Sequence, residues 1–440
     1  MTSGPGSPNR GLGLSLWTAA MFVVANMIGT GVFTSLGFQV AAVPSAFPAL
    51  LLWVVGGLVA LAGALVYGEL GAALPRSGGE YNLLRRSFHP AAGFAAGCVS
   101  ATMGFAAPTA LAAVAMATYL QPLFPGIEPV HFAAGTVVAF TAVHSLPVGW
   151  SSGVNNVLTA AKILLVIAFC CMGFWAGGVS TPLVPKPGDF GLLLSPGFAV
   201  SLVFVSYAYT GWNAAVYVVG DLRRPERLAR ALVAGTLLVT VLYVLVNFVI
   251  LRAVPLEDLA GRIEIGYLAA ERILGATGGR VMAAVLGLVL ASTVSAMVFL
   301  GPRVVRAMGE DEPFLRPLGR ASAGGVPHRA LLLQLGITLI LLYSGTFEQI
   351  LLYAGFTLNL MTAAAVAGVF RLRAGRIPGA VSGRFRTPLY PAVPLFFLGM
   401  SAWTLGYTLL ERPGESLLGL ATASAGAVLY LVAKRTSGIN

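Results

Sequence analysis

The feature that most constrains this chain is a succession of about twelve long apolar runs, each long enough to cross a lipid bilayer as a helix. Short gaps rich in arginine, proline and glycine separate the runs. In lipid, only helices and closed barrels satisfy all their backbone hydrogen bonds, and these runs are too long for barrel strands. The sequence therefore predicts an all-α, multi-pass integral membrane protein, with spans near 16–41, 46–73, 91–121, 130–147, 155–178, 193–220, 227–252, 279–308, 329–345, 347–370, 389–410 and 414–433.

The composition excludes several classes of protein. The chain is 57% hydrophobic and 10% charged, whereas charged residues make up about a quarter of a soluble protein. A net charge of +11 would suit a nucleic-acid binder only if the basic residues shared one solvated face, and here they lie between apolar runs. The spans hold no group of His, Cys, Asp or Glu at metal-ligand spacing, so we expect no metal, no cofactor and no enzyme activity.

The basic residues predict the orientation in the membrane. With the N-terminus in the cytoplasm and twelve spans, most of the 27 lysines and arginines fall in cytoplasmic loops, as the positive-inside rule requires. Both termini are then cytoplasmic. The predicted outer side holds only Lys186, Arg252, Arg262, Arg272, Arg280 and Arg412.

Two spans contain polar, glycine-bearing interruptions halfway across the membrane. The first span carries Gly29 and Gly31, and the sixth carries Thr210 and Gly211. Glycine is also common where membrane helices pack closely, so one such pair alone would indicate packing. Two interruptions at corresponding places in two halves of a chain instead indicate a transporter binding site between internal repeats. We therefore expect a tail at 1–15, a first repeat at 16–178, a second at 193–370, and two further spans with a cytoplasmic tail at 371–440.

Broken helices offer unpaired backbone groups to a ligand. Free N–H groups at the start of a half-helix hold a carboxylate, and free carbonyls at the end of one hold an ammonium group. This arrangement suits the α-amino and α-carboxyl groups of an amino acid. Neither break contains an acid, and Glu69 is the only acid predicted within a span. The sequence therefore favours neutral amino acids over lysine, arginine or polyamines.

Several ordered motifs resemble the amino acid–polyamine–organocation (APC) superfamily, especially its bacterial and L-type amino acid permeases. They are Ile-Gly-Thr-Gly-Val-Phe at 28–33, Gly-Glu-Leu at 68–70, Pro-Arg-Ser-Gly-Gly-Glu-Tyr at 75–81, Tyr-Ala-Tyr-Thr-Gly-Trp-Asn at 207–213, and the tracts 221–227, 301–308 and 384–391. The resemblance implies a LeuT-type 5+5 inverted-repeat fold in which spans one and six are broken. It also implies transport by alternating access.

The same resemblance implies roles for individual residues. The carboxylate of the substrate would contact the amides of Gly29, Thr30 and Gly31, and its ammonium would contact carbonyls of Met27, Tyr207, Ala208 and Thr210; Ile28 is also expected to belong to the substrate site. Tyr207 stands where the family usually has phenylalanine, and we expect it to act as a gate; it could also simply pack in the bundle. Thr210 would narrow the side-chain pocket. Loop 121–130 has no cysteine, so we expect no disulfide-linked partner subunit.

Lys162 lies well inside the fifth span, where a lysine is costly unless it is paired or neutral. It could snorkel to the cytoplasmic surface. In the family, a lysine here resembles the group that stands where sodium-coupled relatives bind sodium. It would then contact the first break and hydroxyls of span eight, for which Ser292, Thr293 and Ser295 are the candidates. We therefore predict sodium-independent transport, either proton-coupled symport or exchange, with a proton as candidate co-substrate.

The remaining polar residues receive plainer interpretations. His144 is predicted to end a helix, and Glu69 and Glu80 to form a conformational latch away from the substrate. Asn359 could line the cavity or bond to another helix. The alternatives to a neutral amino acid transporter are an antiporter or uniporter for cationic amino acids or polyamines, and a non-transporting amino-acid sensor. The short tails suit a prokaryotic inner membrane.

Overall fold

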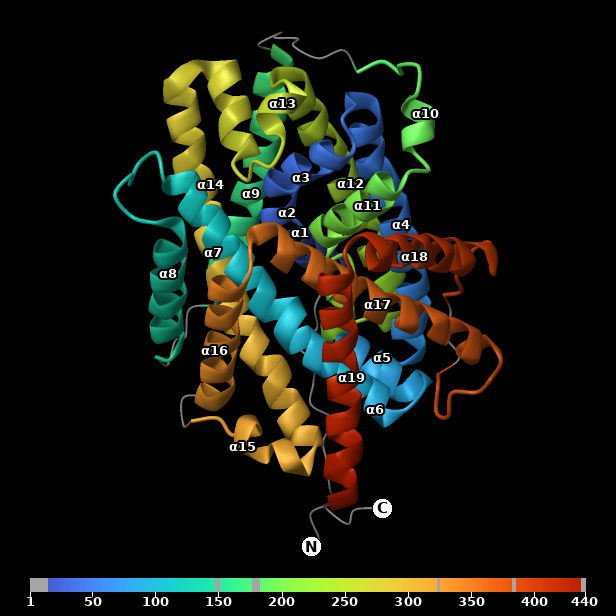
Figure 1. Ribbon diagram of the computed structural model, residues 1–440. Helices are drawn as coiled ribbons and strands as arrows, with labels where there is room; N and C mark the ends of the chain where they lie inside the picture. Colours follow the sequence, from blue (N-terminus) through green and yellow to red (C-terminus); the bar gives the residue numbers. More distant parts are fainter. Residues whose placement is uncertain (1–14, 147–150, 176–182, 323–324, 382–384, 437–440) are drawn as a thin grey trace, which may run out of the picture.

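The computed structural model describes residues 15–146, 151–175, 183–322, 325–381 and 385–436, and every regular element in these ranges is a helix (Figure 1). The predicted tail at 1–15 and the last residues of the C-terminal tail lie almost entirely outside the described residues. The first five predicted spans correspond to α1 (Leu16–Met27), α2 (Thr30–Thr34), α3 (Leu36–Ala42), α4 (Ala46–Ala73), α6 (Pro90–Val99), the π-helix η1 (Ser100–Ala106), α7 (Ala107–Leu120), α8 (Pro129–His144) and α9 (Ser151–Trp175).

The later spans follow in the same order. They correspond to α11 (Pro196–Tyr209), the 3-10 helix η2 (Ala214–Asp221), α12 (Leu228–Ala253), α14 (Ile265–Asp311), α16 (His328–Ser344), α17 (Phe347–Arg373), α18 (Ala392–Glu411) and α19 (Pro413–Thr436). Short connecting helices are α5 (Gly79–Ser87), α10 (Asp189–Leu192), η3 (Pro225–Arg227), α13 (Leu256–Leu259), η4 (Pro313–Leu315) and α15 (Arg316–Gly319).

The number of spans agrees with the prediction from the apolar runs. Among the described residues, nine helices are long and apolar enough to cross a membrane, and three shorter apolar helices occupy the positions of the fourth, fifth and ninth predicted spans. Together they account for the predicted twelve. The all-α, multi-pass membrane fold is therefore confirmed.

The packing of the spans is reciprocal between the two halves of the chain. Span one (α1) packs on span seven (α12), and span six (α11) packs in the same way on span two (α4). Spans two and seven (α4 and α12) contact each other, as do spans three and eight (α7 and α14). The first two contacts are counterparts of each other, and the other two join corresponding spans of the two halves, which is the pattern of the LeuT-type 5+5 inverted repeat. The α18 and α19 helices lie outside this core: α18 packs against α11 and α17, and α19 packs against α6 and α17 (Figure 1).

Several local features depart from plain helices. The third span changes from α6 to the π-helix η1 just before Pro108, which has no backbone N–H to donate to the preceding turn. The eighth span is preceded by a helical segment that begins at Ile265, and Gly275 breaks it with a φ of 75°. The loop between the seventh and eighth spans is therefore partly helical.

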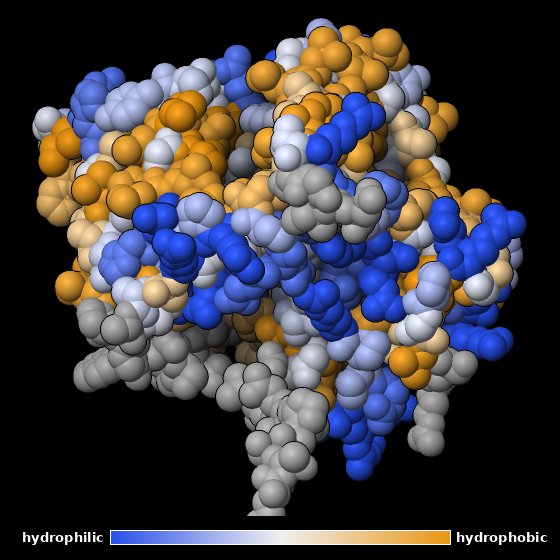
Figure 2. All heavy atoms as spheres, turned by 90° about the horizontal axis from the view of Figure 1, so that it is seen from below, coloured by the Kyte–Doolittle hydropathy of each residue, from blue (hydrophilic) through white to orange (hydrophobic). Residues whose placement is uncertain are grey.

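Hydrophilic residues gather at one end of the molecule. Figure 2 views the end that carries α15 and the last turn of α19, and a band of hydrophilic residues crosses the middle of this face, with hydrophobic residues mostly above it in the picture. Arg316 in α15 and Lys434 and Arg435 in α19 belong to this end. It corresponds to the side that the positive-inside rule predicts to be cytoplasmic, and we call it the basic side.

Candidate functional site

Both predicted breaks are present in the backbone. In the first span, α1 ends at Met27, Ile28 and Gly29 are non-helical, and α2 begins at Thr30. In the sixth span, α11 ends at Tyr209, Thr210 has an extended ψ of 137°, and η2 begins only at Ala214. Gly211 has a φ of 108°, which a side chain at that position would disfavour. The helix ends at each break leave N–H groups and carbonyls without helical partners.

The two breaks lie against each other through their glycines. A Cβ atom on Gly31 would lie 2.4 Å from Cα of Ala208 in the sixth span. A Cβ atom on Gly211 would lie 2.7 Å from the carbonyl carbon of Asn26 in the first span. Each glycine therefore permits a backbone contact with the opposite break.

Tyr243, on α12, bonds to both breaks. Its buried hydroxyl contacts the carbonyl oxygen of Met27 and lies 3.2 Å from that of Ala208. A phenol has one hydrogen to donate, so it forms a full hydrogen bond with only one of the two carbonyls at a time. Sequence reasoning did not identify Tyr243; the only available signal was a tyrosine in the middle of an apolar run. These are two of the carbonyls predicted to bind the substrate ammonium, so Tyr243 orients this part of the site.

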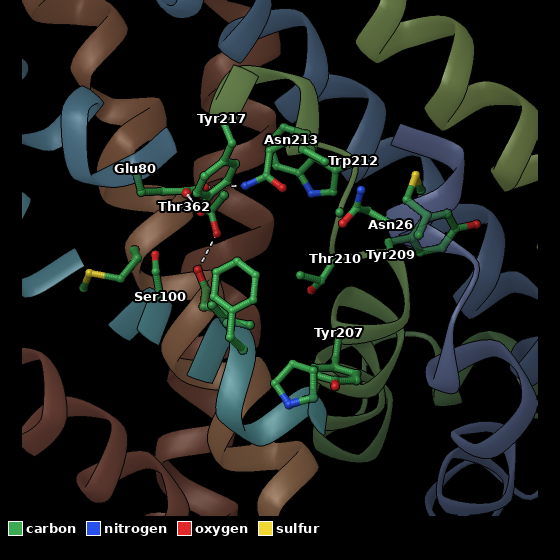
Figure 3. Close-up of a pocket in the computed structure, with 18 of the residues that line it drawn as sticks. Asn26, Glu80, Ser100, Tyr207, Tyr209, Thr210, Trp212, Asn213, Tyr217 and Thr362 are labelled. Atoms are coloured by element: carbon green, nitrogen blue, oxygen red, sulfur yellow. Dashed lines mark hydrogen bonds between the residues drawn. The ribbon is translucent and has the colours of Figure 1, made fainter. Parts of the chain in front are cut away.

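A cavity of about 470 Å³ adjoins the breaks. Figure 3 shows Asn26, Tyr207, Thr210 and Trp212 around it, from the first and sixth spans. The π-helix η1 contributes its opposite wall, with Ser100 and Phe105. Of the predicted substrate residues, the cavity is lined by Met27, Gly29, Thr30, Gly31, Tyr207, Ala208 and Thr210. Ile28 is buried and is not among the lining residues.

The cavity extends toward the basic side. Its far end is lined by Ser77 before α5 and by Arg303 and Ala307 of α14, all of which are exposed. On the same side, Arg76 pairs with Asp311 at 2.7 Å, and Arg85 pairs with Glu312. Burial raises the pKa of Tyr81, and its hydrogen bond to Asp311 adds to this shift while Arg85 opposes it.

Glu80 lies in the cavity, which contradicts its predicted place in a distant latch. Its buried carboxylate accepts hydrogen bonds from Asn213 and Tyr217, which lie beside it in Figure 3. It also accepts one from Tyr67 at 3.0 Å, so all three donors are uncharged. The prediction was wrong because α5 folds back beneath the bundle, so Glu80 meets η2. The cavity therefore contains a carboxylate, although neither break contains an acid.

Glu69, the other residue predicted to belong to the latch, does not line the cavity. Its carboxylate pairs with Arg373 of α17 at 2.6 Å and accepts a hydrogen bond from the Thr387 backbone at 2.7 Å. Glu69 thus ties α4, the second span, to α17, the tenth span, and to the segment that follows α17.

Lys162 contacts one of the three hydroxyls proposed for it. Its buried Nζ donates to Thr293 Oγ1 at 3.2 Å, and Thr293 lies next to Gly29, with its methyl carbon 3.9 Å from the position of a Cβ there. Ser295 instead lies 2.9 Å from Nε2 of His144, which ends α8 as predicted. Ser292 is partly buried and does not line the cavity.

Other predictions concern single side chains. Asn359 satisfies both interpretations, because it lines the cavity and its Oδ1 accepts from Ser401 of α18 at 2.9 Å. All three cysteines are free. The described residues contain no group of acids, histidines or cysteines that could hold a metal ion.

These features define a class of protein: a multi-pass membrane transporter with a central cavity between two broken helices. The chain matches the amino acid permease family over residues 14–412 and belongs to that family, within the APC superfamily. It is a transporter and not an enzyme.

The curated relatives are amino acid transporters as well. The chain is 28% identical to the large neutral amino acids transporter small subunit 2 of Mus musculus, over 95% of this chain and 80% of that protein. It is 26% identical to the serine/threonine exchanger SteT of Bacillus subtilis, over 96% of this chain and 97% of that protein. It is 27% identical to the Asc-type amino acid transporter 1 of Mus musculus, with 95% and 80% covered.

Proposed function

We propose that this protein moves neutral L-amino acids across a membrane by alternating access. The observation that carries the proposal is the meeting of two broken helices at one cavity. The N–H groups at the start of α2 provide partial positive charge for a carboxylate, and the carbonyls that end α1 and α11 provide partial negative charge for an ammonium group. Both charged groups of the substrate are then bound by backbone, while its side chain faces η1 and Thr210.

The orientation follows from the basic side. With that side in the cytoplasm, both termini are cytoplasmic and the cavity opens inward, because Ser77, Arg303 and Ala307 lie at its exposed end. The protein is then in the inward-facing state of the transport cycle.

Substrate class is tested by counterflow in proteoliposomes that contain the purified protein. Labelled alanine, serine, threonine and leucine should accumulate, whereas arginine and putrescine should not. Glu80 provides the specific reason to test the cationic alternative, since a carboxylate in the cavity could compensate a cationic side chain. Uptake of arginine that Glu80→Gln removes would support that alternative. Amino acid binding without counterflow would instead indicate a sensor.

We propose further that Lys162 serves in place of sodium. The buried amine of Lys162 lies beside Thr293 and the first break. When it is protonated, it supplies a positive charge at the point where α1 ends, and it can also release its proton there. Uptake should therefore be unchanged when sodium is replaced by choline. Lys162→Ala should lower uptake at least tenfold and remove its dependence on pH.

The control for this variant is Lys186→Ala, since Lys186 is exposed and lies beyond the cavity. A Lys162→Ala protein whose uptake keeps the wild-type pH profile would exclude the proton role. A proton gradient that fails to drive accumulation would leave exchange as the mode of transport.

A further inference from the structure

A second cavity, of about 300 Å³, lies on the surface beside the starts of α1 and α12. Three arginines line it: Arg223, Arg224 and Arg227, which belong to the segment between η2 and α12. The remaining lining residues are small or apolar: Ser15, Leu16, Ala19, Leu222, Leu228 and Ala231. Its volume is at the lower end of the range for ligand pockets.

The arginines of this cavity differ from several other arginines of the described residues, whose charges are compensated by carboxylates. Arg76, Arg85 and Arg373 each pair with a carboxylate. Within the part of the chain that the structure describes, no carboxylate pairs with any of the three cavity arginines.

Two acids lie near these arginines in the sequence. Glu226 is exposed, belongs to the same turn and does not line the cavity. Asp221 precedes the turn, and its side chain lies outside the described residues. The walls of the cavity therefore present guanidinium groups whose donors are available to an anion.

The surroundings of the cavity are those of a lipid-facing surface. Trp17, next to the lining residue Leu16, is 73% exposed, and tryptophan is typical of the boundary between membrane and water. Along α12, exposed Ala234 and Leu238 follow Arg227 and Ala231 at helical spacing, so an apolar surface leads away from the arginines into the membrane region.

We propose that this cavity binds the headgroup phosphate of an anionic phospholipid in the leaflet on the basic side. The planar guanidinium groups suit phosphate oxygens, and the acyl chains would lie on the apolar surface of α12 beside Trp17. A free phosphate ion has the same charge but gains nothing from that apolar surface. A headgroup bound here contacts the start of α1, the inner half of the broken first span.

The proposal is tested on the full-length protein in mixed micelles at constant ionic strength. Thermal unfolding is followed while phosphatidylglycerol, phosphatidylcholine or glycerol 3-phosphate is titrated. Phosphatidylglycerol should raise the melting temperature of the wild type, and the other two should not. Replacing all three cavity arginines by glutamine (R223Q/R224Q/R227Q) should weaken the apparent affinity for phosphatidylglycerol about 100-fold, at roughly fivefold for each arginine near a charged lipid surface.

The matched control is R316Q/R320Q/R329Q, which removes the same charge from exposed arginines that line neither cavity. It should weaken the apparent affinity for phosphatidylglycerol much less than the first triple variant does, because its arginines do not converge on one cavity. Three results would overturn the proposal: an equal loss in both triple variants, an equal response to phosphatidylcholine, or a response to glycerol 3-phosphate as large as that to the lipid. If the first triple variant elutes as aggregate, the single variants Arg224→Gln and Arg316→Gln provide the same comparison, with an expected difference of about fivefold.

Discussion

The two ends of the substrate cavity are bounded by different kinds of contact. At the end away from the basic side, which we call the outer end, the breaks meet backbone to backbone where Gly31 lies on Ala208, and Tyr119 ties Phe33 of α2 to Gly266 of α14 through two hydrogen bonds. At the end on the basic side, which we call the inner end, charged side chains join the segment around α5 to the end of α14, as in the pair of Arg76 and Asp311.

The contact at the outer end is therefore rigid, whereas the contact at the inner end is adjustable. Close backbone packing depends on shape and is indifferent to salt, and it tolerates no added atoms. Partly exposed ion pairs are weak and are screened by salt. We therefore expect substitutions at the outer end to have large effects that salt does not alter, and those at the inner end to have smaller effects that it does.

The largest effect is expected for Gly31→Val. The new side chain would overlap the Ala208 backbone, so α2 and α11 would have to separate, and counterflow should fall at least about 100-fold. Gly135→Val is the control, because a Cβ at Gly135 meets open space. Turnover of Gly31→Val within twofold of the wild type would show that the breaks do not need this contact.

A smaller effect is expected for Glu80→Ala. The substitution leaves the buried donors of Tyr67, Asn213 and Tyr217 without their acceptor. Each donor that finds no water lowers the free energy of unfolding by about 1–3 kcal/mol. The melting temperature should fall, and counterflow should drop about tenfold. Glu80→Gln keeps one acceptor oxygen, so its melting temperature and counterflow should lie between those of the wild type and those of Glu80→Ala. Equal behaviour of both variants would mean that the hydrogen bonds do not hold η2.

Tyr243→Phe should act on substrate affinity more than on stability. Losing one buried hydrogen bond of about 1 kcal/mol leaves the Met27 and Ala208 carbonyls less firmly oriented, so KM should rise about fivefold. Tyr209→Phe is the control, because that hydroxyl donates to the Trp53 carbonyl at 2.8 Å instead. A KM raised equally in both variants would assign the effect to general packing.

The smallest effect is expected for Arg76→Gln at the inner end. The Arg76 side chain is 58% exposed, so its pair with Asp311 contributes no more than about 1 kcal/mol. Transport should change less than fivefold at low salt, and the change should disappear near about 1 M salt, where screening is strong. A change that persists at high salt would contradict the electrostatic account of this end.

Much of the fold could be predicted because the bilayer imposes strict local rules. A span must satisfy its own backbone, so its length and hydropathy are visible in the sequence, and a glycine with polar neighbours marks where a helix stops. This is why the break between Met27 and Thr30, and the one after Tyr209, appeared at the expected positions.

Contacts between distant helices could not be predicted in this way. The sequence alone determined the number of spans, the two breaks and the uneven distribution of arginine, because hydropathy and backbone satisfaction act within each segment. Only the tertiary structure decided that Glu80 lies in the cavity, that Ser295 meets His144 while Lys162 meets Thr293, and that Tyr243 bridges both breaks. These pairings depend on which helix faces which at a given depth, and no local pattern of residues records that.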